Sequence, residues 1–137
     1  MTLESQVTSL ELSRKLEKLG VLGGVFSWVQ DLRRVENSTK RLKLRPSWQM
    51  RKNHMSSWVI VTSAWTVAEL GEMLKALSSR EWSAWTEWNY VYKKWTCFLG
   101  NENSDTEWSE DGDTEADARA KMLIYLIENK LINEKES

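Results

Sequence analysis

The sequence predicts an α+β fold, a single domain over residues 1–137 in which about three helices pack on an antiparallel sheet. Three segments open with helix-capping residues and continue with apolar residues at helical spacing. Short β-branched or alternating segments lie between them. A chain of 137 residues that is 41% hydrophobic can build one core without disulfides or metal. We expect the order α-β-(β)-β-α-β-β-α.

The first expected helix follows Thr8, which is placed to form a capping box with Glu11. Three leucines at helical spacing then give the helix one apolar stripe: Leu12, Leu16 and Leu19. Gly20 supplies the stop, because glycine readily adopts the left-handed conformation that ends many helices.

The middle helix begins with a second capping box, formed by Thr66 and Glu69. Gly71 inside this helix costs about 1 kcal/mol relative to alanine, which indicates that another part of the chain packs closely there. Thr114 caps the last helix, which we expect to lie at the centre of the core. Its inward stripe comprises Ala116, Ala120, Leu123, Ile127 and Leu131.

Strands are expected at residues 25–30 and 57–63, where short runs of apolar and β-branched residues stand between turn or polar residues. A further short strand is expected near residues 41–44, where leucines alternate with basic residues. These segments supply the first strands of the predicted sheet.

Two alternating segments follow the middle helix, at residues 88–92 and 95–99. Lys93 and Lys94 stand between them as a hairpin turn or bulge. Residues 101–113 are polar and acidic and end near a glycine, which predicts an exposed acidic loop.

The composition argues against an enzyme and against a metal or cofactor site. The chain has one histidine, His54, and one cysteine, Cys97, so a zinc site or a nucleophile–base pair has almost no residues to draw on. Asn101, Asn103 and Asp105 match the opening of a calcium loop, but its required glycine and final glutamate are missing. The sequence lacks a signal peptide and an apolar run of about 20 residues, so we expect a cytoplasmic protein outside membranes.

Charge is segregated although the formal net charge is only −1. Basic residues dominate residues 33–54: Arg33, Arg34, Lys40, Arg41, Lys43, Arg45, Arg51 and Lys52. Such a segment can bind the phosphates of nucleic acid. It can equally meet the acidic residues of 101–117, within one molecule or across a homodimer.

Nine tryptophans are the most unusual feature of the composition. Trp28, Trp58 and Trp95 lie in apolar strand patterns and are expected in the core. Trp82, Trp85 and Trp88 stand three residues apart among small and charged residues, and Trp48 and Trp108 lie in polar segments where exposed rings are expected. Because aromatic rings concentrate at interfaces, these five are the candidate partner-binding residues. A pocket lined by tryptophan, for a nucleotide or a sugar, is a weaker alternative.

The segments VTSLELSRKLEKLGV, AWTVAELGEML and TEADARAKMLIYLIENKLI resemble a family of small uncharacterised bacteriophage and prophage proteins. The resemblance implies a phage or prophage origin and one compact domain, but no activity. We therefore expect a non-enzymatic accessory protein that binds a macromolecule in the bacterial host. A protein partner is favoured, in a host-modulating or anti-defence role, and nucleic-acid binding through residues 33–54 is the alternative.

Overall fold

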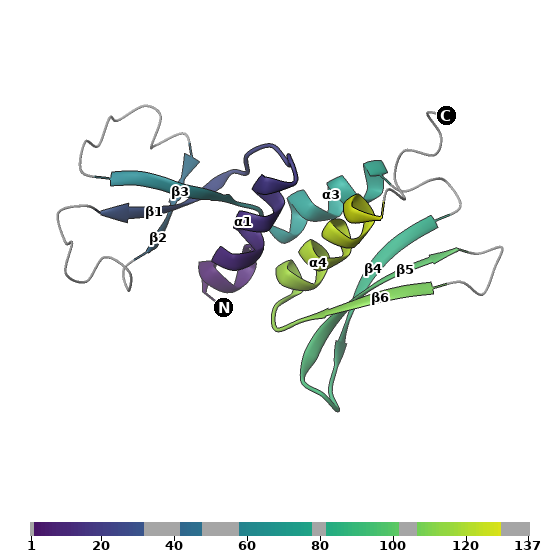
Figure 1. Ribbon diagram of the computed structural model, residues 1–137. Helices are drawn as coiled ribbons and strands as arrows, with labels where there is room; N and C mark the ends of the chain where they lie inside the picture. Colours follow the sequence, from purple (N-terminus) through teal and green to yellow (C-terminus); the bar gives the residue numbers. More distant parts are fainter. Residues whose placement is uncertain (1, 32–41, 48–57, 78–81, 102–106, 130–137) are drawn as a thin grey trace, which may run out of the picture.

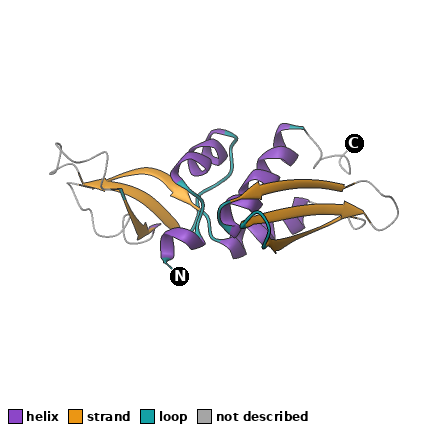
Figure 2. Cartoon of the chain, turned by 90° about the horizontal axis from the view of Figure 1, so that it is seen from below, coloured by secondary structure: helices purple, strands orange, loops and turns teal. Residues whose placement is uncertain are grey.

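A computed structural model describes residues 2–31, 42–47, 58–77, 82–101 and 107–129 of the chain. Two three-stranded antiparallel sheets lie at opposite ends of the molecule, and the helices lie between them (Figures 1 and 2). The fold is therefore α+β, as the sequence predicts. The strands form two sheets instead of the one expected: among the described residues, β1, β2 and β3 pair with one another, and β4, β5 and β6 pair with one another.

The N-terminal part of the chain builds the first sheet and one helix. A short 3-10 helix, η1 (Leu3–Gln6), precedes α1 (Leu10–Lys18). The strands are β1 (Phe26–Asp31), β2 (Lys43–Pro46) and β3 (Trp58–Ala64), in the spatial order β2-β1-β3. A small core on this sheet contains Val7, Trp28, Leu44 and Ala64.

The C-terminal part of the chain builds the second sheet, whose three strands lie between two helices in the sequence. Helix α3 (Val67–Leu77) leads to the strands, and α4 (Glu115–Glu128) follows them. The strands are β4 (Trp82–Asn89), β5 (Lys94–Asn101) and β6 (Glu107–Gly112), in the spatial order β4-β5-β6.

Helix α4 is the centre of the larger core, as expected. It packs on β5 and β6 on one side and on α3 and α1 on the other. Leu123 is fully buried, and Ile127 is half-buried against the same cluster. Alanines at 116, 118 and 120 are also fully buried, because small side chains let neighbouring elements approach the first turns of the helix. Leu131 lies outside the described residues.

Two of the three predicted helix starts are confirmed. Thr66 and Glu69 form a reciprocal capping box, in which each side chain accepts a hydrogen bond from the other residue's backbone N–H at 2.9 and 3.1 Å. The Thr114 hydroxyl accepts the Asp117 N–H at 3.1 Å. Gly20 has the positive φ of 93° that a helix stop requires.

The predicted start of the first helix is wrong by one residue. Ser9 is the cap, and its hydroxyl accepts the Leu12 N–H at 3.4 Å. Thr8 is unavailable for capping because it is fully buried and otherwise bonded. Its hydroxyl contacts the Ser13 hydroxyl at 2.6 Å and accepts the Trp65 N–H at 3.1 Å.

Gly71 has the close neighbour that its place in a helix predicts. An added Cβ at this position would lie 2.2 Å from Nη1 of Arg119, which crosses from α4. The Arg119 guanidinium donates to Val67 O on α3 at 3.4 Å and forms an ion pair with Glu115 at 3.3 Å. The glycine therefore makes room for an arginine that links α3 to α4.

Two predictions about the second sheet are wrong in detail. The strand expected at 88–92 instead covers Trp82–Asn89, and Tyr90 and Tyr92 lie in the turn that follows. Of the acidic loop expected at 101–113, residues 107–112 form β6, while residues 102–106 lie outside the described part. β6 forms because alternate residues, Trp108 and Gly112 among them, fall on the inner face of the sheet, whereas Glu107 and Asp111 occupy the outward positions.

Candidate binding surface

The second sheet has an inner face covered by α4 and an outward face on which none of the described helices packs. The register places Ala84, Cys97 and Leu99 on the inner face, where they join the core. The neighbouring residues point the opposite way because side chains alternate along a strand. The outward face therefore carries Trp85, Phe98 and Ser109 in three adjacent strands.

Two aromatic rings stack on the outward face. The ring centroids of Trp85 and Phe98 are 5.4 Å apart, and the ring planes differ by 19°. The Trp85 indole N–H donates to the Glu87 carboxylate at 2.9 Å, which fixes the ring along β4. Both rings remain partly exposed, so the sheet presents a small ordered aromatic platform with polar residues around it.

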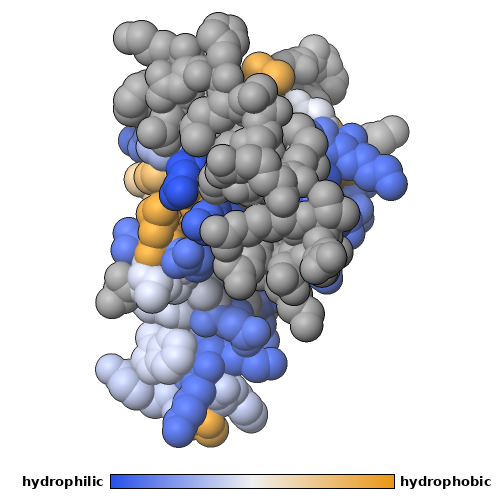
Figure 3. Space-filling model, turned by 90° about the vertical axis from the view of Figure 1, so that its left-hand side faces the viewer, coloured by the Kyte–Doolittle hydropathy of each residue, from blue (hydrophilic) through white to orange (hydrophobic). Residues whose placement is uncertain are grey.

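The turn between β4 and β5 is the most exposed apolar feature of this sheet. Tyr90, Val91 and Tyr92 are 83%, 82% and 73% exposed. The hairpin extends beyond the helices and forms the lowest point of Figure 1. At the same end of the molecule, Figure 3 shows pale and orange residues, of intermediate and high hydropathy, beside blue ones.

The turn is held in a defined shape by the residue that precedes it, Asn89, and by its last residue, Lys93. The Asn89 carboxamide oxygen accepts the N–H groups of Val91 and Tyr92 at 2.9 and 3.1 Å. Lys93 has a positive φ of 56°, which reverses the chain into β5. The expected turn at Lys93 and Lys94 is thus present at Lys93, and Lys94 begins the strand.

Trp88 joins this turn to the sheet. It packs edge-on against Trp95 and Tyr90, with ring centroids 5.7 and 6.4 Å apart, and is 37% exposed. We name Trp88, Tyr90, Val91 and Tyr92 the hairpin tip. The hairpin tip therefore combines Trp88, a candidate partner-binding residue, with Tyr90 and Tyr92, for which the sequence pattern predicts a strand.

The other candidate tryptophans are not gathered at this tip. Trp85 lies on the outward face, and only the backbone of Trp82 is described, in β4. Trp108 is half-buried and packs against Tyr125 of α4 at 6.0 Å, so its expected exposure is wrong. The cause is β6, which turns Trp108 to the inner face. Trp48 lies outside the described residues.

Two of the three tryptophans expected in the core have described side chains, and both lie in the core. Trp28 is buried on the first sheet, and Trp95 is half-buried against the larger core. Trp65, which is not one of the tryptophans expected in the core, is also fully buried, and its indole N–H donates to Leu22 O at 2.8 Å. The side chain of Trp58 lies outside the described part.

Of the basic candidates, only Lys43 and Arg45 lie in the described residues. They are two residues apart on β2, and so share one face of the first sheet. The other six, Arg33, Arg34, Lys40, Arg41, Arg51 and Lys52, fall outside the described ranges, as does His54.

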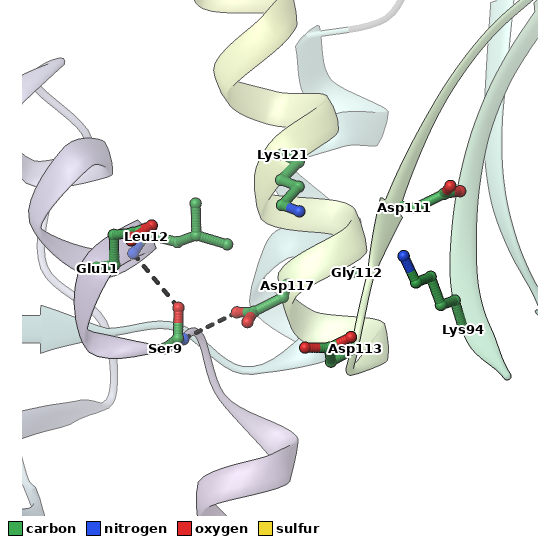
Figure 4. Close-up of a pocket in the computed structure, with 9 residues that line it drawn as sticks. All are labelled: Ser9, Glu11, Leu12, Lys94, Asp111, Gly112, Asp113, Asp117 and Lys121. Atoms are coloured by element: carbon green, nitrogen blue, oxygen red, sulfur yellow. Dashed lines mark hydrogen bonds between the residues drawn. The ribbon is translucent and has the colours of Figure 1, made fainter. Parts of the chain in front are cut away.

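A polar cavity of about 240 Å³ lies where the first turns of α1 and α4 meet the end of the second sheet (Figure 4). Carboxylates and ammonium groups both line it: Glu11, Asp111, Asp113, Asp117, Lys94 and Lys121. Ser9 connects the two helices here, because its N–H donates to Asp117 Oδ1 at 2.8 Å. Burial raises the pKa of Asp117, and the hydrogen bonds from Ser9 and the charge of Lys121 oppose that rise.

A second, more open cavity of about 590 Å³ lies beside the first sheet. Gly23, Ser27, Ser47, Ser63 and Glu69 contribute to its wall. Neither this cavity nor the one in Figure 4 has a tryptophan in its lining.

Cys97 is a buried thiol at the centre of β5. Burial raises its pKa to about 12, although the charge of Arg119 acts in the opposite direction. A thiol with such a pKa is protonated at neutral pH and is a poor nucleophile. It therefore packs as a small apolar side chain.

Within the described ranges, no group of three or more His, Cys, Asp or Glu side chains could hold a metal ion. No helix in the same part of the chain combines the length and apolar character needed to cross a membrane.

A comparison of the chain with protein-family models, curated proteins and solved structures found no match in any of the three.

Proposed function

We propose that this chain is a non-enzymatic binding protein that contacts a partner protein through the hairpin tip. The observation that carries the proposal is a shaped, protruding turn in which three successive apolar residues are at least 73% exposed. Exposed apolar side chains grouped on a protruding element mark interaction surfaces more often than scattered ones do.

The chemistry of the tip suits a protein partner. Tyrosine and tryptophan lose little conformational entropy on binding and offer both an apolar ring and a polar group, so they are frequent at the energetic centre of interfaces. Asn89 and the φ of Lys93 already fix the turn, so binding does not have to order it. Lys93 and Lys94 would favour a partner surface with acidic groups near an apolar depression.

The resemblance to phage proteins gives this proposal its setting. A phage or prophage protein with this surface would act in the bacterial cytoplasm, on a host protein or on another phage protein. Binding that modulates a host activity or a defence system is the role we favour.

The experiment is affinity capture from host lysate with matched variants. Tyr90→Ser with Tyr92→Ser should weaken retention of the partner by about 30-fold or more, the loss typical of central interface rings. The control is Leu22→Ser, which removes an apolar side chain that is 85% exposed but lies between α1 and β1. A partner retained equally by the tip variant and by Leu22→Ser would contradict the proposal.

Nucleic-acid binding through the basic segment remains the second candidate, and the same capture tests it. Binding to nucleic acid would fall steeply with salt, would disappear after nuclease treatment and would weaken in Lys43→Ala with Arg45→Ala. Binding through the hairpin tip should depend weakly on salt and be unchanged in that basic-segment variant.

A further inference from the structure

The outer edge of β4 differs from the other sheet edges in its lack of protection. β4 pairs with β5 over eight consecutive residues without a register shift, and in the described part of the chain it has no partner on its other side. Among its eight residues, Glu87 alone carries a charge, and none is proline. Long, regular and weakly charged edges are the ones that pair with another strand.

The remaining edges carry features that discourage such pairing. β2 contains Lys43 and Arg45 and ends at Pro46. β6 contains three acidic residues in six, so two copies of it would repel each other. β3 has no charge, but its register with β1 shifts between Trp28 and Val29, and irregularity of this kind distorts an edge.

The sequence of β4 is suited to pairing with a second copy of itself. In WSAWTEW, an antiparallel pair centred on Trp85 sets Ser83 opposite Glu87 of the second copy and Ala84 opposite Thr86. This register brings no like charges together. It also sets Trp85 opposite Trp85, and aromatic pairs across strands stabilise a sheet.

We infer that two copies of this chain associate edge to edge through β4 and form a continuous six-stranded antiparallel sheet. Each Trp85 already stacks on Phe98 of its own chain. The Trp85 pair joins these two stacks into one row of four rings on the outward face. The net charge of −1 leaves little repulsion between the copies. A two-fold axis passes between the two Trp85 residues, so the interface closes with two subunits.

The register gives a test that depends on single charges. Ser83 and Glu87 are both exposed, and they face each other twice in the dimer. Ser83→Lys should tighten dimerisation by forming two opposite-charge pairs, and Ser83→Glu should weaken it, each by roughly 2- to 30-fold. Adding Glu87→Lys to Ser83→Glu should restore dimerisation, because the two facing positions then carry opposite charges. Sedimentation equilibrium of the purified full chain measures all of these dissociation constants.

Ser109 supplies the matched control. It is exposed on the same outward face but belongs to β6, at the other edge. Ser109→Lys and Ser109→Glu should leave the dissociation constant unchanged. A wild-type chain that stays monomeric at every attainable concentration overturns the inference. So does a dimer that responds to Ser109 and not to Ser83, or to neither.

This inference is independent of the hairpin tip. Tyr90→Ser with Tyr92→Ser should leave the dimer intact, because neither residue lies in the paired segment 82–88. Conversely, the Ser83 variants should still bind a protein partner through the tip. If β4 instead accepts an extended segment of another protein, the purified chain remains a monomer in the sedimentation experiment.

Discussion

Replacing Gly112 by alanine should destabilise the protein more than the same change at Gly71 or at Gly20. Gly112 is buried at the end of β6, directly against the first turns of α4. An added Cβ would lie 2.5 Å from Ala118 N and 2.9 Å from the Asp117 carbonyl carbon. Both are backbone atoms of the central helix, so no side-chain rotation can relieve the contact.

The size of the effect follows from the displacement that α4 must undergo. Ordinary contacts of a Cβ begin near 3.4 Å, so the helix has to withdraw by about 0.9 Å. Overpacking of this kind costs about 1–3 kcal/mol in a dense core. The same movement disturbs the Ser9–Asp117 hydrogen bond, so we expect a loss near the upper end of that range.

Two other glycines provide the comparison. At Gly71 the added Cβ meets only the end of the Arg119 side chain, and alanine gains about 1 kcal/mol of helix propensity, so the net change should stay within about 1 kcal/mol of zero. At Gly20 the space is open, but the φ of 93° strains alanine by about 1–2 kcal/mol.

Urea unfolding, followed by tryptophan fluorescence and far-UV circular dichroism, measures this series. With a slope of about 1–3 kcal/mol per molar urea, a loss of about 3 kcal/mol should lower the Gly112→Ala midpoint by about 1–3 M. If Gly112→Ala unfolds within about 0.5 kcal/mol of wild type while Gly20→Ala is clearly destabilised, the described packing of β6 on α4 is incorrect.

Three further predictions concern the core and its titrating groups. Leu123→Ala should lower the free energy of unfolding by about 2–5 kcal/mol in the same assay, because Leu123 is fully buried in α4. A change below about 0.5 kcal/mol would mean that α4 is peripheral. Cys97 should resist alkylation by iodoacetamide at pH 8 until the protein unfolds, since its pKa is about 12, and labelling of the native protein at the rate of a free thiol would contradict its burial. The raised pKa of Asp117 means that its stabilising contribution is present below its unfolded value and is lost as pH rises through the folded value. The stability of wild type relative to Asp117→Asn should therefore decline as the pH rises above about 3.8, and parallel pH profiles for the two proteins would refute this assignment.

The helices were predictable because their signals are local. The capping box at Thr66 and the cap at Thr114 each need only residues within one turn, and both are present. The exception, Thr8, shows where local signals fail: a hydroxyl bonded to Trp65, 57 residues away, can no longer cap its own helix. Sequence spacing alone does not reveal such a competing contact.

The second sheet was less predictable because it depends on pairing between distant segments. The acidic sequence of β6 is typical of an exposed loop. The segment nevertheless pairs with β5 along its whole length and packs Trp108 against the core. In β4, the spacing of three residues between tryptophans is compatible with a helix or a strand. The segment is a strand because it pairs with β5. The hairpin tip did carry a local signal, since an asparagine before a tight turn accepts backbone hydrogen bonds as Asn89 does.

The position of α4 has a consequence for the order of events during synthesis. It is the last described helix, yet it contacts η1, α1, α3 and the whole second sheet. The Ser9–Asp117 bond spans 108 residues, so the loops that close the core are long. Folding rates fall as contacts become more distant in sequence. A nascent chain that has released β4, β5 and β6 still exposes their inner face to water, and we expect it to rely on chaperones until residues 115–128 leave the ribosome.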